Sequence, residues 1–100
     1  LFTFEDLIRI DGRGIQMLLK EITTDQLVVA LKSASEELKQ KVFGNLSTRA
    51  ATMLRDEMEM LGPVRLSEVE EARRTIVDAA LRLERDGRIF IAREGGDAYA

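Results

Sequence analysis

Charged residues in one helical stretch carry the clearest chemical pattern of this sequence. Residues 47–65 read STRAATMLRDEMEMLGPVR, where Arg49, Asp56 and Glu57 surround an Ala/Met/Leu stripe and Arg65 follows a Gly-Pro break. At 100° per residue, Arg49 and Asp56 lie two turns apart on one face of a helix. Glu57 instead projects within the apolar arc, where an unpaired carboxylate is costly. The chemistry that these residue types offer is ion pairing.

Two interpretations of Glu57 are open at this stage. Either the apolar arc is only partly buried, or Glu57 has a cationic partner such as Arg65 beyond the turn. A solvated ridge with one local ion pair is the simpler hypothesis and is modestly favoured by the pattern. The sharper hypothesis is a ridge of mixed charge that is displayed to another protein.

Catalytic chemistry is poorly supported. The sequence contains no histidine and no cysteine, so it lacks the commonest general base and every thiolate nucleophile or thiolate ligand. Adjacent carboxylates such as Asp56 and Glu57 point apart on a helix and are typical of a solvated turn. The segment DGRG at residues 11–14 lacks the spacing of a phosphate loop. We predict no enzyme activity, no metal and no cofactor.

Composition narrows the class of partner. The 100 residues carry a net charge of -3, with 33% charged residues of both signs, which argues against a nucleic-acid interface because such a surface needs clustered Lys and Arg. The longest apolar run, LVVAL at residues 27–31, is far shorter than the roughly 20 residues that span a bilayer. We expect no membrane insertion, and the absence of cysteine makes the cytoplasm the default compartment.

The elements that must position the ridge read as helices almost throughout. Apolar residues recur at helical spacing, and the expected N-caps are Asp11, Thr23 with Gln26, Ser33 with Glu36, Ser47, and Ser67 with Glu70. The helix after Ser47 is expected to stop at Gly62-Pro63 and the longest helix, over residues 68–86, at Gly87.

These patterns predict an all-α fold: a single compact domain of five or six short helices. A short extended segment is expected near residues 88–92. We assign residues 1–10 to a hinge or linker with a first helical turn and residues 11–92 to the helical core. Residues 93–100 are expected to form a flexible tail.

Several segments, in order, resemble the C-terminal domain of the bacterial flagellar motor switch protein FliG. LFTFEDL is similar to its Met-Phe-x-Phe hinge motif, ALKSASEELKQKVFGNLSTRAA to its central helices, and GPVRLSEVEEA to its most recognisable stretch. The similarity runs from Leu1 through RIFIA. It implies an armadillo-like, right-handed superhelical arrangement. Leu1 stands where the family hinge has Met, and Ser33 where Gly is common.

The resemblance implies a rotor component of the flagellar switch complex, at the cytoplasmic face of the inner membrane in the basal body. Its ridge would contact the cytoplasmic loop of the stator protein MotA to transmit torque, and reorientation of the ridge would set the direction of rotation. Further implied partners are FliM and neighbouring FliG subunits, although the FliM docking motif of a preceding domain is not in this chain. Carried over residue by residue, the ridge is Lys32, Arg49, Asp56, Glu57 and Arg65, and the hinge residues are Phe2, Phe4, Gly62 and Pro63.

The alternative class is a helical adaptor or the helical cytoplasmic domain of a magnesium transporter. A magnesium sensor needs several convergent carboxylates. Here Asp56 and Glu57 are flanked by Arg49, Arg55 and Arg65, an arrangement better suited to ion pairs than to a hard cation.

Overall fold

The computed structural model describes residues 1–92, which form a helical domain, and the predicted flexible tail of residues 93–100 lies outside the described residues. The elements are a 3-10 helix η1 (Phe4–Arg9) and the α-helices α1 (Gly12–Leu19), α2 (Thr24–Ala30), α3 (Glu36–Gly44), α4 (Thr48–Met60) and α5 (Leu66–Arg85). An antiparallel bridge joins Ile10 to Ile91, in the segment that was expected to be extended. The predicted all-α class is therefore confirmed.

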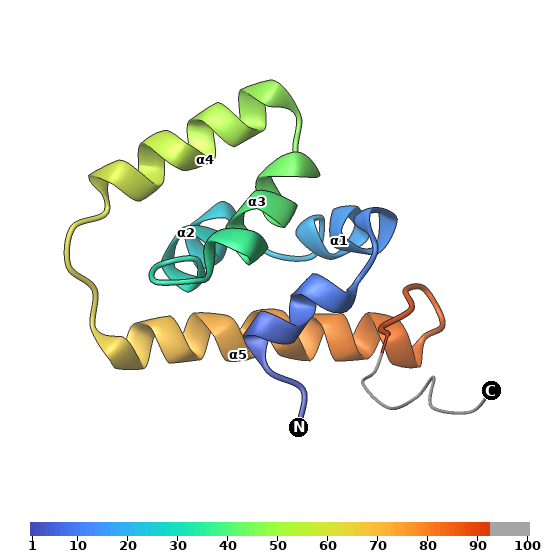
Figure 1. Ribbon diagram of the computed structural model, residues 1–100. Helices are drawn as coiled ribbons and strands as arrows, with labels where there is room; N and C mark the ends of the chain where they lie inside the picture. The colour runs from blue at the N-terminus through green and yellow to red at the C-terminus, as the bar shows by residue number, and fades with distance from the viewer. Residues whose placement is uncertain (93–100) are drawn as a thin grey trace.

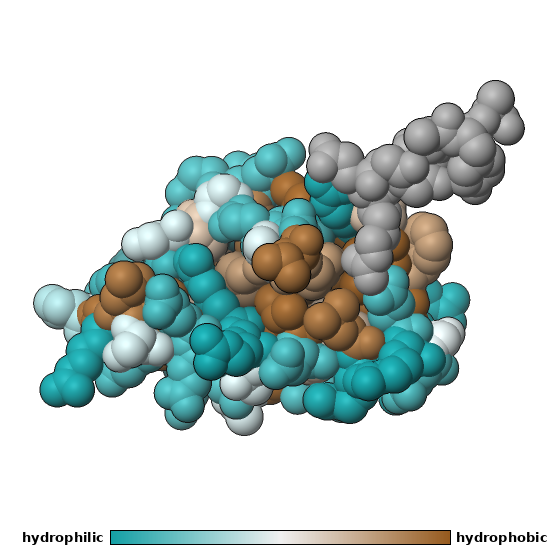
Figure 2. Space-filling view, turned by 90° about the horizontal axis from the view of Figure 1, so that it is seen from below, coloured by the Kyte–Doolittle hydropathy of each residue, from teal (hydrophilic) through white to brown (hydrophobic). Residues whose placement is uncertain are grey.

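Three layers of helices build the domain. Figure 1 shows α5 along one side of the molecule, α4 on the opposite side and α1, α2 and α3 between them. The middle helix α2 packs against both α4 and α5, while η1 packs against α5 and α3. A 90° turn brings the α5 side into view, with apolar side chains near its centre and hydrophilic side chains along its edges (Figure 2).

Local capping groups start three helices where the sequence predicts. The Asp11 carboxylate accepts the N–H of Gly14 at 2.8 Å, and the Ser47 hydroxyl accepts the N–H of Ala50 at 3.1 Å. Thr23 and Gln26 form a reciprocal capping box ahead of α2. Each bond satisfies an N–H that has no partner within its own helix, so these three predictions are confirmed.

Two other predicted caps are wrong. Ser35, and not Ser33, caps α3: its hydroxyl accepts the N–H of Leu38 at 3.1 Å. Ser33 lies in the tight turn after α2 with φ of 64°, a left-handed conformation in which glycine is the least strained residue. The role of position 33 is therefore to form this left-handed turn, and not to cap α3.

The predicted start of the longest helix is also wrong. It begins at Leu66, two residues earlier than expected, with Arg65 as N-cap and no side-chain cap. The Arg65 carbonyl already accepts the N–H groups of Glu68 and Val69 at 3.0 and 3.2 Å. Ser67 is therefore inside the first turn, where it cannot act as an N-cap with Glu70.

Glycines end α4 and α5 as expected. Gly62 follows the end of α4 with φ of 36°, and Gly87 follows α5 with φ of 73°. After α5, the N–H of Gly87 donates to Glu84 O and that of Arg88 to Leu83 O, both at 2.9 Å. This is the bond pattern of a Schellman motif, which needs a left-handed residue.

The hydrophobic core draws on every helix. Its fully buried large side chains are Ile10, Ile15, Leu18, Leu31, Leu38, Ile76 and Ile91. Apolar spacing along α5 predicts an inner line of Val69, Ala72, Ile76, Ala80 and Leu83, of which all but the half-buried Ala72 are buried. The amphipathic α4 contributes Leu54 alone as a fully buried residue. Within residues 1–92 no charged side chain is fully buried, so all the predicted ridge residues reach the surface.

Two glycines give a matched test of this packing. A Cβ on Gly14 would collide with the Ile10 side chain and lie 3.0 Å from the capping oxygen of Asp11, whereas a Cβ on Gly44 would meet nothing within 4 Å. We expect Gly14→Ala to lower the free energy of unfolding by about 1–3 kcal/mol, as overpacking does. Gly44→Ala should raise it by about 0.4–1 kcal/mol. Urea unfolding of both variants measures these values, and equal effects would contradict the described contact at Gly14.

Candidate functional site

The predicted ridge residues lie on three segments. Arg49, Asp56 and Glu57 are on α4, Arg65 is the N-cap of α5, and Lys32 lies in the turn between α2 and α3. Arg49, Asp56 and Arg65 are exposed, whereas Lys32 and Glu57 are half-buried. We call these five residues the ridge. Seven residues separate Arg49 from Asp56, so α4 displays opposite charges about 10 Å apart along its axis.

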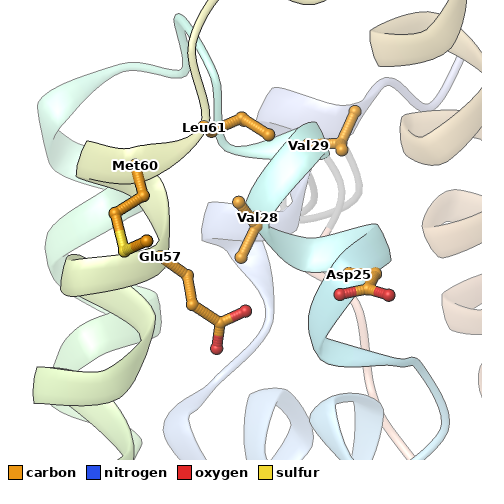
Figure 3. Close-up of a pocket in the computed structure, with 6 residues that line it drawn as sticks. All are labelled: Asp25, Val28, Val29, Glu57, Met60 and Leu61. Carbon is orange, nitrogen blue, oxygen red and sulfur yellow. The ribbon is translucent and has the colours of Figure 1, made fainter.

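Glu57 faces the groove between α4 and α2. The groove has a volume of about 320 Å³ and is lined by Asp25, Val28, Val29, Glu57, Met60 and Leu61. Figure 3 shows the Glu57 side chain extending from α4 toward α2, where Asp25 also borders the groove. Val28 is buried and Met60 is 84% exposed. The groove therefore combines an apolar floor with two carboxylates.

This geometry resolves the question that the sequence left open about Glu57. Leu54 is buried, but Ala50, Met58 and Leu61 on the same arc of α4 are only half-buried. Glu57 and Arg65, both among the described residues, form no ion pair. The first interpretation therefore holds: the arc is partly buried, and the Glu57 carboxylate reaches solvent at the groove.

Lys32 differs from the other ridge residues because its ammonium is engaged within the chain. Its Nζ donates to the Gly62 carbonyl at 2.8 Å. This bond connects the turn after α2 with the loop between α4 and α5. Of the predicted hinge residues at this loop, Gly62 is thus tethered, and Pro63 follows it on the exposed surface.

Arg73 supports the same region and was missed by sequence reasoning. It lies on α5, and its Nε donates to Ala30 O at 2.9 Å while one terminal nitrogen donates to Lys32 O at 2.8 Å. The guanidinium also stacks over the Phe4 ring, 4.9 Å from its centroid. The carbonyl partners Ala30 and Lys32 are 43 and 41 residues away in the chain, and Phe4 is further still, so no local pattern could indicate them.

Arg55 on α4 is exposed, as expected for a residue beside the ridge. Its guanidinium lies over the Phe43 ring of α3, 4.9 Å from the centroid. Such a contact at an exposed site contributes about 0.5–1 kcal/mol. It gives α4 a second attachment besides its packing on α2.

The predicted hinge begins in a segment that packs firmly. Phe4 is buried under Arg73, and Phe2 is half-buried against the core. The Lys41 ammonium of α3 donates to Ile8 O at 2.7 Å. The backbone N–H and the hydroxyl of Ser35, the N-cap of α3, both donate to the Glu5 carboxylate. Residues from Phe4 onward are therefore part of the helical body.

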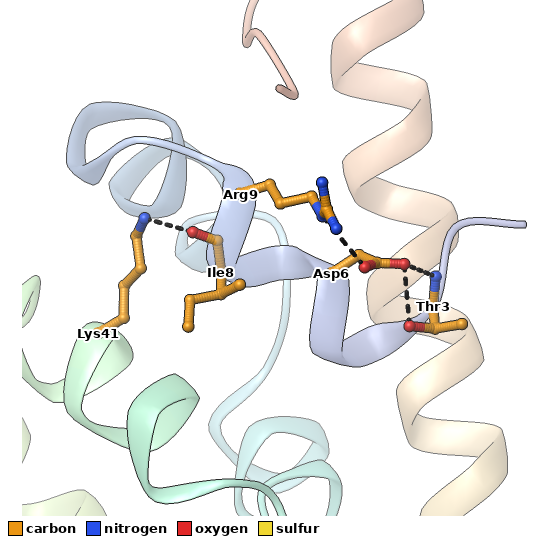
Figure 4. A network of polar contacts seen from close by, with 5 residues as sticks. All are labelled: Thr3, Asp6, Ile8, Arg9 and Lys41. Atoms are coloured by element: carbon orange, nitrogen blue, oxygen red, sulfur yellow. Dashed lines mark hydrogen bonds and ion pairs between the residues drawn. The ribbon is translucent and has the colours of Figure 1, made fainter. Parts of the chain in front are cut away.

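A carboxylate organises the start of η1 (Figure 4). Asp6 accepts the backbone N–H of Thr3 at 2.8 Å, the Thr3 hydroxyl at 3.0 Å and Nε of Arg9 at 3.3 Å. The Thr3 N–H bond is the main reason why the pKa of Asp6 lies below its ordinary value, with the other two bonds acting in the same direction. Charge on Asp6 therefore favours the folded form of this segment.

The described residues offer neither a cluster that could hold a metal ion nor a helix that could cross a membrane. Among residues 1–92, no three carboxylate, His or Cys side chains converge in a way that could hold a metal ion. Within the same residues, every helix is too short or too polar to cross a bilayer. The chemistry available at the ridge is that of charge and hydrogen bonding.

Comparison with known proteins points to one family. The family model described as the FliG C-terminal domain matches residues 1–91. Over 97 residues, the chain is 53% identical to the flagellar motor switch protein FliG of Thermotoga maritima and 47% identical to that of Bacillus subtilis. It covers 29% of the length of each of these proteins, and each alignment covers 97% of this chain.

Solved structures agree with the sequence matches. A crystal structure of FliG residues 116–343 from H. pylori superposes with a TM-score of 0.86 at 36% identity, over 88% of this chain and 39% of that one. Full-length FliG from Aquifex aeolicus gives a TM-score of 0.83 at 41% identity, over 86% of this chain and 27% of that one. The likeness thus extends to the arrangement of the helices.

The Asp6 bonds predict a pH dependence. A carboxyl with a lowered folded-state pKa stabilises the fold above its unfolded pKa, and this contribution is lost as the pH falls through the folded value. We expect native protein to lose more thermal stability than Asp6→Asn when the pH drops from neutrality to below 3.8, the ordinary value for Asp. Melting curves across this range measure the difference. Asp78→Asn, at an exposed position of α5, should behave like native protein. An unchanged pH dependence in Asp6→Asn would contradict the assigned role.

Proposed function

Because this chain belongs to the family of FliG C-terminal domains, we propose that it is part of a rotor protein of the bacterial flagellar motor switch complex. In this proposal the ridge contacts the cytoplasmic loop of the stator protein MotA and transmits torque. The observation that carries it is the display of both signs of charge on one outer helix: Arg49 and Asp56 are exposed on α4, and Glu57 faces an open groove.

Weak, mixed-sign contacts suit a surface that must engage and release repeatedly. An exposed ion pair contributes only about 0–1 kcal/mol. Several such pairs bias the position and orientation of a partner without trapping it, and complementary charge speeds encounter. Lys32, Arg49, Asp56, Glu57 and Arg65 act together in this proposal, so no single charge is indispensable.

The groove beside Glu57 favours a cationic side chain of the partner. Lys and Arg carry an apolar stem with a charged head. The stem fits the Val28 and Leu61 floor, and the head fits between Asp25 and Glu57, which border the groove from α2 and α4. In this proposal, Glu57 binds a cationic side chain of the stator loop.

Direction switching is proposed to be a reorientation of the ridge about the hinge. Phe4 is 6% exposed and lies under Arg73, so a swivel that preserves the core must turn N-terminal to Phe4, next to Phe2. Gly62 and Pro63 are the second hinge position, where the chain leaves α4. The first segment precedes the ridge-bearing body, whereas Gly62 and Pro63 lie within it, between α4 and Arg65.

The family match supports a setting for this function. We propose a location at the cytoplasmic face of the inner membrane, in the flagellar basal body, with FliM and neighbouring FliG subunits as further partners. The role is structural and mechanical, and it requires no enzyme activity or cofactor. A helical adaptor or a magnesium-transporter domain is not favoured, because the family match covers residues 1–91.

Charge reversal tests the ridge. We expect Arg49→Ala or Asp56→Ala to weaken binding to a MotA cytoplasmic loop by at most about fivefold, since one exposed pair contributes roughly 0–1 kcal/mol. Asp56→Lys combined with Glu57→Lys should weaken binding at least about tenfold, because two attractions become repulsions. Binding and site-specific crosslinking to the loop, at low and high salt, measure these effects.

A matched control uses the opposite side of the molecule. Asp78→Lys with Asp86→Lys changes the net charge by the same amount at exposed positions on α5 and just after it, and it should leave loop binding unchanged. If both double variants weaken binding equally, net charge and not the ridge is responsible. If Arg49→Ala alone stops rotation in a folded, assembled rotor, collective action is wrong.

A further inference from the structure

The attachment of α4 to the rest of the domain is sparse. The helix packs on α2 through Leu54 and its half-buried neighbours, and Arg55 lies over Phe43 of α3. Beyond its last turn, the chain crosses to α5 through a loop without helix or strand. In Figure 1 this loop runs from one side of the molecule to the other. It is the covalent connection between α4 and α5, which both also pack on α2.

One side chain reaches this loop from the middle layer. The Lys32 Nζ donates to Gly62 O at 2.8 Å, which is a short bond for an N–H donor. Gly62 itself has φ of 36°, so its carbonyl direction depends on a backbone conformation that few residues adopt. The bond therefore fixes the loop at Gly62, the residue whose backbone is the least restricted sterically.

The backbone from which the Lys32 side chain extends is itself fixed by hydrogen bonds. Arg73 donates to the carbonyl of Ala30, the last residue of α2, at 2.9 Å and to that of Lys32, in the turn after it, at 2.8 Å. Because the guanidinium is a planar fork with fixed donor directions, it orients the turn from which the Lys32 side chain departs. The contacts form a continuous path from α5 through Lys32 to Gly62.

We propose that Lys32 is a positioning residue, which clamps the α4–α5 loop to the end of α2 and thereby fixes α4, with Asp56 and Glu57, relative to Arg65. Its importance for torque rests on the proposed function, but the clamp itself does not. The geometry requires an N–H donor at the Nζ position and not a positive charge. A contact of Lys32 with the stator, which the proposed function adds to the clamp, would depend on the charge.

Variants of Lys32 separate the donor from the charge. Lys32→Met keeps an unbranched apolar stem and removes the donor. Lys32→Arg keeps both donor and charge. Nε-acetyl-lysine, incorporated at position 32 by codon suppression, removes the charge and keeps one N–H at Nζ. Each variant leaves the Lys32 backbone carbonyl available to Arg73.

The readout is a distance within the full-length protein. Nitroxide labels are placed on cysteines introduced at Met53 on α4 and Leu66 at the start of α5, which are 55% and 71% exposed. This chain has no cysteine of its own, and any cysteine elsewhere in the full-length protein is replaced by serine. Pulsed electron paramagnetic resonance then gives the distribution of distances between the labels, with no stator present.

We expect Lys32→Met to broaden or shift the Met53–Leu66 distance distribution, and the Arg and acetyl-lysine variants to keep the native one. Lys39→Met is the matched control, because Lys39 pairs locally with Glu36 at 2.9 Å on α3 and should leave the distribution unchanged. Circular dichroism verifies that each variant keeps its native helix content. If Lys32→Met loses helix content, the acetyl-lysine variant is the test. A native distance distribution in that variant supports the clamp, and a changed one contradicts it.

Two results would overturn the clamp. One is a native distribution in a folded Lys32→Met variant, and the other is an acetyl-lysine variant that departs from the native distribution. Failure of the proposed function looks different, since it appears as unchanged MotA loop binding after reversal of Asp56 and Glu57. The distance measurement contains no stator, so each hypothesis can fail alone.

Discussion

Arg73 joins three elements of this domain through one guanidinium. Two of its nitrogens donate to the carbonyls of Ala30 and Lys32, and its face covers the Phe4 ring. The seven-residue α2 is too short to be stable alone, and its last carbonyls have no partners within the helix. A fork of donors from α5 supplies a partner for Ala30 O, the last carbonyl of α2, and for Lys32 O in the turn after it. The buried Phe4 fixes η1 against the same helix α5.

The outer layer depends on this arrangement. Because α2 is the helix on which α4 packs, the position of α2 decides where Arg49 and Asp56 face solvent. The turn that Arg73 holds also presents Lys32 to Gly62. A surface that exchanges weak charged contacts needs a rigid support, since a displacement of an ångström or two is comparable to the difference between a close ion pair and a separated one. The core and its edge bonds provide that support.

Local features of the fold were predictable, and long-range ones were not. The caps at Asp11, Thr23 and Ser47 depend on neighbours three residues away, so spacing alone reveals them. Ser33 and Ser67 fit the same pattern but do not cap a helix. Ser33 lies in a left-handed turn, and α5 already begins at Leu66, with the Arg65 carbonyl accepting its first N–H groups. Wheel geometry correctly marked Glu57 as unusual. It could not find Asp25 across the groove or Arg73 on a distant helix, because tertiary packing alone brings these residues together.

Native-state hydrogen exchange tests most directly whether Arg73 supports the ridge-bearing body. In full-length protein with Arg73→Met, the amides of Ile10 at the end of η1 and Leu31 at the end of α2 should lose protection together. Both amides donate to backbone carbonyls of their own elements, so they report on η1 and α2 directly. Arg73→Lys keeps the charge but lacks the planar fork of donors. It should lower the exchange protection of the Leu31 amide in the same way. Native protection at both amides in Arg73→Met would contradict the account.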